Sequence, residues 1–164
     1  MKKELDFDQV KAEKVRLLEE NENIVLATSL NNRVTARVVR YASEGLTIIF
    51  FTLTNLKKVA QIRANPKVAL CLKNASIEGN SVLVSQQEEE GKRLAEIIKK
   101  KFPNYLEWWH ARTAELIVFV KVTPTLVVSY VYKDSKPLLE YLDLQNKTAY
   151  QSIIWEKQEY LQEV

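Results

Sequence analysis

Residues 24–41 read IVLATSLNNRVTARVVRY, two runs rich in β-branched residues on either side of an Asn-Asn pair. Residues 24–29 and 34–41 are dominated by side chains that favour strands. Asn31 and Asn32 tolerate the positive φ angles of a tight turn between strands. The segment therefore predicts a β-hairpin.

Similar runs along the rest of the chain predict five more strands. These strands are expected at residues 46–52, 68–72, 77–84, 114–122 and 126–132, with a turn at residues 43–45 and a break at Thr123-Pro124. Helical patterns occur at residues 8–20, 57–64, 88–101 and 104–112, with Asp6 or Asp8 as the first cap and Asn65-Pro66 ending the second helix. Many short strands with few helices indicate a mainly β fold, either a barrel or a sandwich.

The composition is typical of an ordinary globular domain. The chain has 164 residues, of which 46% are hydrophobic and 27% charged, with a net charge of +3. This length fits one domain spanning residues 1–164. No apolar run reaches the roughly 18 residues of a membrane helix, and the first residues turn polar where a secretory signal is apolar. We therefore expect a cytoplasmic protein with no membrane partner, and the scattered lysines do not indicate nucleic-acid binding.

Cys71 and His110 are the only cysteine and the only histidine. A single cysteine excludes an intrachain disulfide, and a single histidine argues against hydrolase triads and zinc sites. Cys71 lies in the apolar run of residues 68–72, so a buried, inert thiol is expected. The tail from Ser135 shows no clear period but is too apolar for disorder, and we expect it to pack on the barrel or on a partner subunit. Its apolar side chains include Tyr141, Tyr150, Ile153, Ile154, Trp155 and Tyr160.

A group of cations suggests a phosphate site. Lys57 and Lys58 begin a predicted helix, where free N–H groups attract anions and lysines oppose the helix dipole. Such a local conflict tends to mark a functional site. Arg37 suits bidentate phosphate contact and would lie near this helix if strands 34–41 and 46–52 pair. Phe51 and Thr52 end the strand beside the same point.

Each of these features also has an ordinary structural explanation. Lys57 and Lys58 fit two solvated side chains on an exposed turn, and Arg37 fits a solvated sheet face. Phe51 fits the core equally well. The acidic start and basic end of residues 88–101 are explained by the helix dipole, and Trp108-Trp109 is explained by core or interface packing.

The order of these segments resembles the FMN-binding split barrel of the pyridoxamine 5′-phosphate oxidase-like superfamily. The matching segments are residues 26–28, 37–39, 50–52, 57–62, 65–70 and 77–79. Residues 122–130 are similar to the last barrel strands, so the resemblance covers about residues 24–132. It implies an antiparallel Greek-key split β-barrel of about six to seven strands with flanking short helices, followed by a C-terminal extension over residues 133–164.

The resemblance also implies FMN at the interface of a homodimer. The residues that it assigns to the cofactor are Arg37, Lys57 and Lys58 for the phosphate, the backbone of Val38 and Val39 for the ring edge, Phe51 and Thr52 for the pocket, and Asn74 and Tyr130 from the partner subunit. Leu56 departs from the family pattern, because a small hydroxyl residue often helps to hold the phosphate at this position.

The function implied is a flavin-dependent oxidoreductase with an unknown small-molecule substrate, with no assigned catalytic residue and no metal. Authentic oxidases end in a basic, histidine-containing segment, whereas residues 133–164 contain no arginine or histidine. Oxidation of vitamin B6 is therefore not expected. The alternatives are binding of the deazaflavin F420 or haem, and a non-enzymatic, stress-associated flavin-binding protein. A barrel that binds single-stranded nucleic acid is disfavoured, because lysines and aromatics are not interleaved on one strand face.

Overall fold

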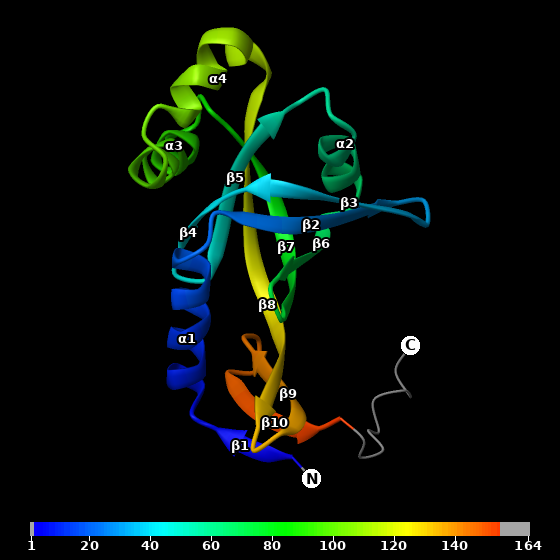
Figure 1. Cartoon of the computed structure of the whole chain (residues 1–164). Coiled ribbons are helices and arrows are strands. Elements are labelled where there is room, and N and C mark those ends of the chain that lie inside the picture. The colour runs from blue at the N-terminus through cyan, green and yellow to red at the C-terminus, as the bar shows by residue number, and fades with distance from the viewer. Residues whose placement is uncertain (1, 155–164) are drawn as a thin grey trace.

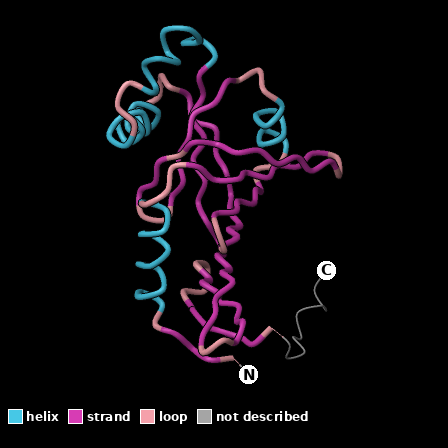
Figure 2. The backbone as a smooth tube through the Cα atoms, viewed as in Figure 1, coloured by secondary structure: helices cyan, strands magenta, loops and turns pink. Residues whose placement is uncertain are grey.

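The computed structural model describes residues 2–154 and contains one antiparallel sheet flanked by short helices (Figures 1 and 2). The strands are β1 (Lys3–Leu5), β2 (Asn23–Leu30), β3 (Arg33–Arg40), β4 (Ala42–Glu44), β5 (Thr47–Leu53), β6 (Lys67–Leu72), β7 (Ala75–Ser85), β8 (Ile117–Lys133), β9 (Lys136–Asp143) and β10 (Thr148–Ile153). The helices are α1 (Phe7–Glu19), α2 (Lys57–Ala64), α3 (Glu89–Lys101), α4 (Tyr105–Thr113) and the 3₁₀ helix η1 (Ala114–Leu116). This confirms the predicted mainly β fold of the split-barrel class. None of the helices within residues 2–154 is long and apolar enough to cross a membrane.

The sheet divides along β8, its longest strand. The strand order is β1-β10-β9-β8-β7-β6-β2-β3, with β5 pairing β8 and β4 pairing β5. On one side of β8, β5 pairs with the first half and β9 pairs with the second half. Along the other side, β7 pairs with both halves. Figure 1 shows the result: β8 runs from the α3–α4 end of the molecule to the β9–β10 end.

A β-bulge marks this division. The register between β7 and β8 shifts between Glu78 and Gly79, opposite Pro124. Proline has no N–H group and is tolerated within a sheet at a bulge, and a Cβ on Gly79 would lie 2.8 Å from the Thr123 carbonyl oxygen. The prediction of two strands separated at Thr123-Pro124 is therefore wrong, because the bulge allows one strand to continue through the proline.

The predicted hairpin of residues 24–41 is confirmed as β2 and β3. Asn31 and Asn32 have φ angles of 49° and 62°, and positive φ at both central residues belongs to the turn that matches strand twist. The expected pairing between β3 and β5 is wrong, because β3 is the last strand of the sheet and β5 pairs with β4 and β8. Residues 42–44, expected largely as a turn, form β4, and the chain reverses at Gly45, where φ is 58°.

Two hydrophobic clusters lie on opposite faces of β5. Ile48 and Phe50 point into the first cluster, which fills the barrel. Ile49 and Phe51 point the other way, into a second cluster covered by α3 and α4. Successive strand residues face opposite sides. Since both sides of β5 are covered, its sequence is a continuous apolar run without alternation.

The segment after β8 extends the sheet. β9 returns along β8, β10 pairs with β9, and β1 adds at the edge. Tyr141 and Tyr150 stack with ring centroids 4.7 Å apart. The expectation that this segment packs on the barrel is confirmed for the described residues, although its strands were not predicted; Trp155 and Tyr160 lie outside the described residues.

Cys71 is exposed, so the expectation of a buried thiol is wrong. In β6 buried and exposed residues alternate strictly. Val68, Leu70 and Leu72 face the barrel, while Ala69 and Cys71 face outward. Alanine and cysteine are small hydrophobic residues, and for this reason the alternation is not visible in the sequence as a change of polarity.

Candidate cofactor site

The first turn of α2 forms one side of the candidate site. Leu56 is the N-cap residue and provides no side-chain hydrogen bond to the helix. Within residues 2–154, no acceptor contacts the backbone N–H groups of Lys57 and Lys58. A helix start with free N–H groups and the positive end of the dipole favours an anionic ligand.

Lys58 points inward from this turn and is partly buried. Its Nζ donates a hydrogen bond to Thr52 Oγ1 at 3.0 Å. Burial lowers the pKa of Lys58 from its ordinary value, and the positive charge of Arg37 lowers it further. Lys57, by contrast, is exposed at the helix surface. The structure thus brings Lys58, Thr52 and Arg37 together, with Lys57 at the rim.

Arg37 lies on the inner face of β3. Its Nη1 donates to Thr28 Oγ1 at 2.7 Å and to the Leu26 carbonyl oxygen at 3.2 Å. Its Nη2 donates to Thr35 Oγ1 and, at 3.4 Å, to Gln61 Oε1. Burial lowers the pKa of the guanidinium from its ordinary value. All four acceptors are neutral, so the charge of Arg37 is held in place without being neutralised.

Arg37 is close to α2 for a reason that the sequence did not indicate. The expected route, a pairing of β3 with β5, does not occur. Instead α2 packs on β2, and β3 lies next to β2 in the sheet (Figure 1). The predicted proximity of Arg37 and the helix is therefore confirmed, while the predicted pairing is wrong.

No carboxylate balances these two cations among the described residues. The ion pairs formed within residues 2–154 use other cations, including Lys14, Arg40 and Arg93. Buried or partly buried charges are normally paired, because leaving water without a counter-charge is costly. Arg37 and Lys58 together therefore form a positively charged site that an anion would complete.

The side chains of Phe51 and Thr52 lie on opposite faces of β5. Thr52 faces Lys58. Phe51 packs against α4, with ring centroids 5.2 Å from Tyr105 and 6.4 Å from Trp109. The structure therefore brings Thr52, but not the ring of Phe51, to the cations.

Val38 and Val39 lie on the sheet-edge strand β3. The side chain of Val39 packs against the barrel core, whereas that of Val38 is 65% exposed on the outer face. In the described residues, β3 has a strand neighbour on only one side. Its other edge is open to hydrogen bonding with a ligand.

Asn74 and Tyr130 are bonded to each other, away from Arg37. Asn74 Nδ2 donates to the Tyr130 carbonyl oxygen at 2.7 Å, and Tyr130 N donates to the Asn74 carbonyl oxygen at 2.8 Å. Three strands, β2, β6 and β7, separate β3 from β8. Along β8 the buried Ser129 faces inward and Tyr130 is exposed, so Tyr130 and Arg37 lie on opposite faces of the sheet. Within one chain, Asn74 and Tyr130 therefore do not lie beside the cations Arg37 and Lys58.

The sequence model of the pyridoxamine 5′-phosphate oxidase family matches residues 10–130, which include β2, β3 and α2. The chain belongs to this family. The match covers Arg37, Lys57 and Lys58 together with Asn74 and Tyr130. No curated protein matches the chain.

Solved structures share the fold of this family member at low sequence identity. General stress protein 26 from Bacillus anthracis is 24% identical, with a TM-score of 0.59 over 83% of this chain and 99% of that chain. A pyridoxamine 5′-phosphate oxidase-related, FMN-binding protein from Nostoc punctiforme is 16% identical, with a TM-score of 0.57 over 90% and 94%. The haem storage protein HutZ from Vibrio cholerae is 11% identical, with a TM-score of 0.59 over 69% and 88%.

Gln61 belongs to the candidate site but was not recognised from the sequence. It lies fully buried in α2, where its Oε1 accepts hydrogen bonds from Thr28 Oγ1 at 2.7 Å and Thr35 Oγ1 at 2.8 Å. A signal was present: Gln61 stands between Val59 and Ile62, which are both buried on the helix. A polar residue on the apolar face of a helix has to find a buried partner.

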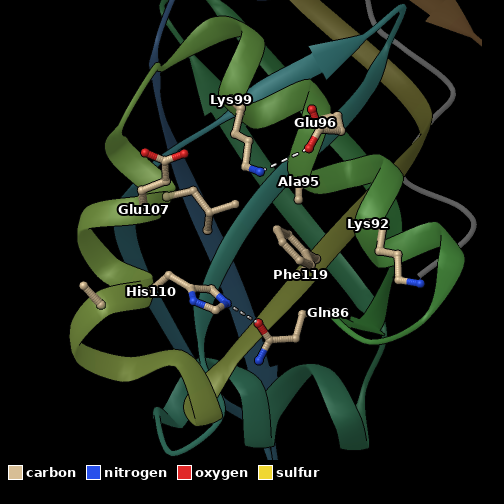
Figure 3. A pocket seen from close by; sticks show the side chains of 10 residues that line it. Gln86, Lys92, Ala95, Glu96, Lys99, Glu107, His110 and Phe119 are labelled. Carbon is tan, nitrogen blue, oxygen red and sulfur yellow. Dashed lines mark hydrogen bonds and ion pairs between the residues drawn. The ribbon is translucent and has the colours of Figure 1, made fainter.

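A separate cavity of about 490 Å³ lies between α3 and α4 of this family member. Figure 3 shows His110 beside Gln86 and Lys99 beside Glu96. His110 Nε2 lies 3.0 Å from Gln86 Oε1, and Lys99 Nζ lies 3.1 Å from Glu96 Oε1. Its floor includes Phe119. Each lysine that lines the cavity forms an ion pair, Lys92 with Glu89 and Lys99 with Glu96. Glu107 adds a further carboxylate, so the cavity lacks the unpaired cations found at Arg37 and Lys58.

Proposed function

We propose that this chain binds FMN, with the cofactor phosphate at Arg37 and Lys58. The observation that supports this most strongly is a pair of cations whose hydrogen-bond partners within residues 2–154 are all neutral. A phosphate would form charge-assisted hydrogen bonds with both side chains. The free N–H groups of the first α2 turn lie next to Lys58 and would add donors.

The other assigned residues surround this point in the proposal. Lys57 adds charge at the rim, and Thr52 holds the ammonium of Lys58. The open edge of β3 offers the backbone of Val38 and Val39 to the flavin ring, and Phe51 supports the wall from behind through its contacts with α4. Leu56 supplies no hydroxyl to the phosphate, so the chain uses one donor fewer than the family pattern.

Asn74 and Tyr130 require a second copy of the chain in this proposal. Tyr130 lies on the outer face of the sheet, and Asn74 is bonded to it from the exposed turn between β6 and β7. The outer face also carries exposed apolar side chains: Val25, Val34, Val38 and Tyr132. Val38, Val25 and Cys71 are direct cross-strand neighbours. An apolar patch of this kind marks an interaction surface, and a homodimer would bring Asn74 and Tyr130 of one subunit to the cations of the other.

Cys71 provides a direct test of the homodimer. If the outer face is covered, a thiol reagent should label Cys71 slowly in the concentrated protein and rapidly on dilution. Light scattering should give twice the chain mass under the protected condition. A monomer that still binds flavin would contradict the proposed arrangement.

The bound flavin would supply electron or hydride transfer, while the protein orients it and limits its exposure to water. We propose an oxidoreductase that acts in the cytoplasm on a small molecule of unknown identity. Haem is a less suitable ligand, because the only histidine, His110, bonds to Gln86 in the cavity between α3 and α4.

The visible absorbance spectrum of the purified protein tests the cofactor. Flavin bands are expected, whereas a Soret band would indicate haem and a deazaflavin spectrum would indicate F420. Calorimetric titration with FMN and riboflavin then tests the phosphate, since riboflavin has the same ring and ribityl chain without it. Equal affinity for the two ligands would contradict a phosphate site at Arg37 and Lys58.

A further inference from the structure

Gln61 connects the hydrogen-bonded groups that surround Arg37 at the candidate phosphate site. Its side-chain oxygen receives hydrogen bonds from two hydroxyls, Thr28 and Thr35, and from the Arg37 guanidinium. Its Nε2 donates to the Arg33 carbonyl oxygen at 3.4 Å. An amide placed the other way round would direct its N–H groups at the guanidinium, so the surroundings fix the orientation of Gln61.

The same oxygen determines the direction of both hydroxyl groups. A threonine hydroxyl has one proton to donate. Thr28 and Thr35 each donate that proton to Gln61 and accept a bond from Arg37 with a lone pair. Gln61 therefore holds the guanidinium both directly and through the hydroxyls of Thr28 and Thr35. Within residues 2–154, the Nε–H group of Arg37 has no acceptor and stays available to a ligand.

The neutrality of Gln61 is as important as its geometry. A glutamate has nearly the same shape and could accept the same hydrogen bonds, but it would form a buried ion pair with Arg37. Such a pair would satisfy the guanidinium internally and place a negative charge where a phosphate should bind. The amide retains the acceptor and leaves the positive charge available.

We propose that Gln61 is a positioning residue that sets the preference for phosphorylated flavin, by orienting Arg37 without neutralising it. This inference rests on the proposed function and extends it to a residue that would not itself contact the cofactor. It makes the choice between glutamine and glutamate at position 61 a determinant of FMN binding over riboflavin binding.

The test compares Gln61→Glu and Gln61→Met with the wild type by calorimetric titration of FMN and riboflavin. Gln61→Glu should weaken FMN roughly tenfold to a hundredfold and change riboflavin by less than about threefold. Gln61→Met keeps the Arg37 charge but removes its acceptor, so it should weaken FMN by only about threefold to tenfold. A purely structural role would weaken both ligands equally.

Asn65→Asp is the matched control for an amide-to-acid change at the same helix–sheet contact. Asn65 donates to Ser29 Oγ at 2.9 Å and makes no bond to Arg37. This variant should change the ratio of FMN affinity to riboflavin affinity by less than about threefold. A loss equal to that of Gln61→Glu would overturn the inference, because any acidic side chain at this helix–sheet contact would then suffice.

A double-mutant cycle tests whether Gln61 acts through Arg37. In an Arg37→Ala background, Gln61→Met should change FMN affinity by less than about twofold, and a larger effect would overturn the inference. If a thermal melt shows that Gln61→Glu is not folded, the cycle still decides the question, because it uses only Gln61→Met and Arg37→Ala. If the wild type and Gln61→Glu both bind FMN more tightly than riboflavin to the same degree, only the role of Gln61 is refuted. A wild type with no such preference refutes the phosphate site as well.

Discussion

Two regions of this molecule bury lysine in opposite ways. Lys14 of α1 is almost fully buried and pairs with Glu140 of β9 at 2.6 Å, and the second carboxylate oxygen of Glu140 accepts a bond from Gln151 at 3.1 Å. Lys58 of α2 is partly buried beside Arg37, and its ammonium donates a hydrogen bond to the neutral hydroxyl of Thr52. One cation is neutralised within the chain and the other is not.

The presence or absence of a counter-charge distinguishes a structural ion pair from a candidate ligand-binding site. The Lys14–Glu140 pair joins the first helix to a strand that follows 126 residues later, and its charges need nothing from outside. Arg37 and Lys58 repel each other and gain no carboxylate within the described residues. A fold that retains such a pair gives up some stability, a cost that is typical of positions selected for binding.

The largest expected effect comes from breaking the internal pair. Glu140→Ala leaves Lys14 buried without a counter-charge and should lower the free energy of unfolding by about 3–5 kcal/mol. Urea denaturation of the ligand-free protein measures this change. The double variant Lys14→Met/Glu140→Leu should recover most of the loss, and recovery of none would mean that packing, not charge, is responsible.

Removing the site cations should instead affect the ligand. Lys58→Ala and Arg37→Ala should each weaken FMN by about 1.5–3 kcal/mol and riboflavin far less, because each removes a charge-assisted hydrogen bond to phosphate. Lys57→Ala should cost about 0.5 kcal/mol, since this side chain is exposed and screened. Calorimetry with both ligands gives these values. A loss of under about 0.5 kcal/mol for all three would mean that they are solvated cations.

The pH dependence of binding should follow Lys58. Its pKa in the free protein lies below the ordinary 10.5, and a bound phosphate would raise it by stabilising the charged form. FMN affinity should therefore be highest below the lowered pKa and should fall as the pH rises through it towards 10.5, while the stability of the ligand-free protein rises over the same window. Titration with riboflavin corrects for ionisation of the flavin ring. A ratio of the two affinities that does not vary with pH would contradict this assignment.

The smallest expected effect is on the stability of the empty site. Lys58→Met removes a partly buried charge that has no counter-charge among the described residues, and it keeps most of the side-chain volume. It should therefore leave the free energy of unfolding unchanged or raise it by up to about 1 kcal/mol. Thermal unfolding without ligand measures this. Destabilisation comparable to that of Glu140→Ala would show that both lysines are structural and would remove the distinction between the two regions.

The sequence determined those features that depend on neighbours along the chain. The hairpin follows from two β-rich runs around Asn31-Asn32, and α2 begins and ends at the predicted residues, Lys57 and Ala64. Asp6, one of two candidate caps, caps α1 by accepting a bond from Gln9 N at 2.8 Å. The cations were also recognisable, because lysines at a helix start conflict locally with the dipole.

Tertiary structure alone decided which of these local pieces meet. Strand pairing is set by side chains distant in sequence, and so β5 joins β8 and the open edge falls to β3. The bulge at Gly79 carries β8 through Pro124, and the second cluster under α3 and α4 places the ring of Phe51 in a core, away from the cations. Gln61 became recognisable as part of the site only once α2 was placed on β2, because a buried amide acquires its role from the donors that surround it.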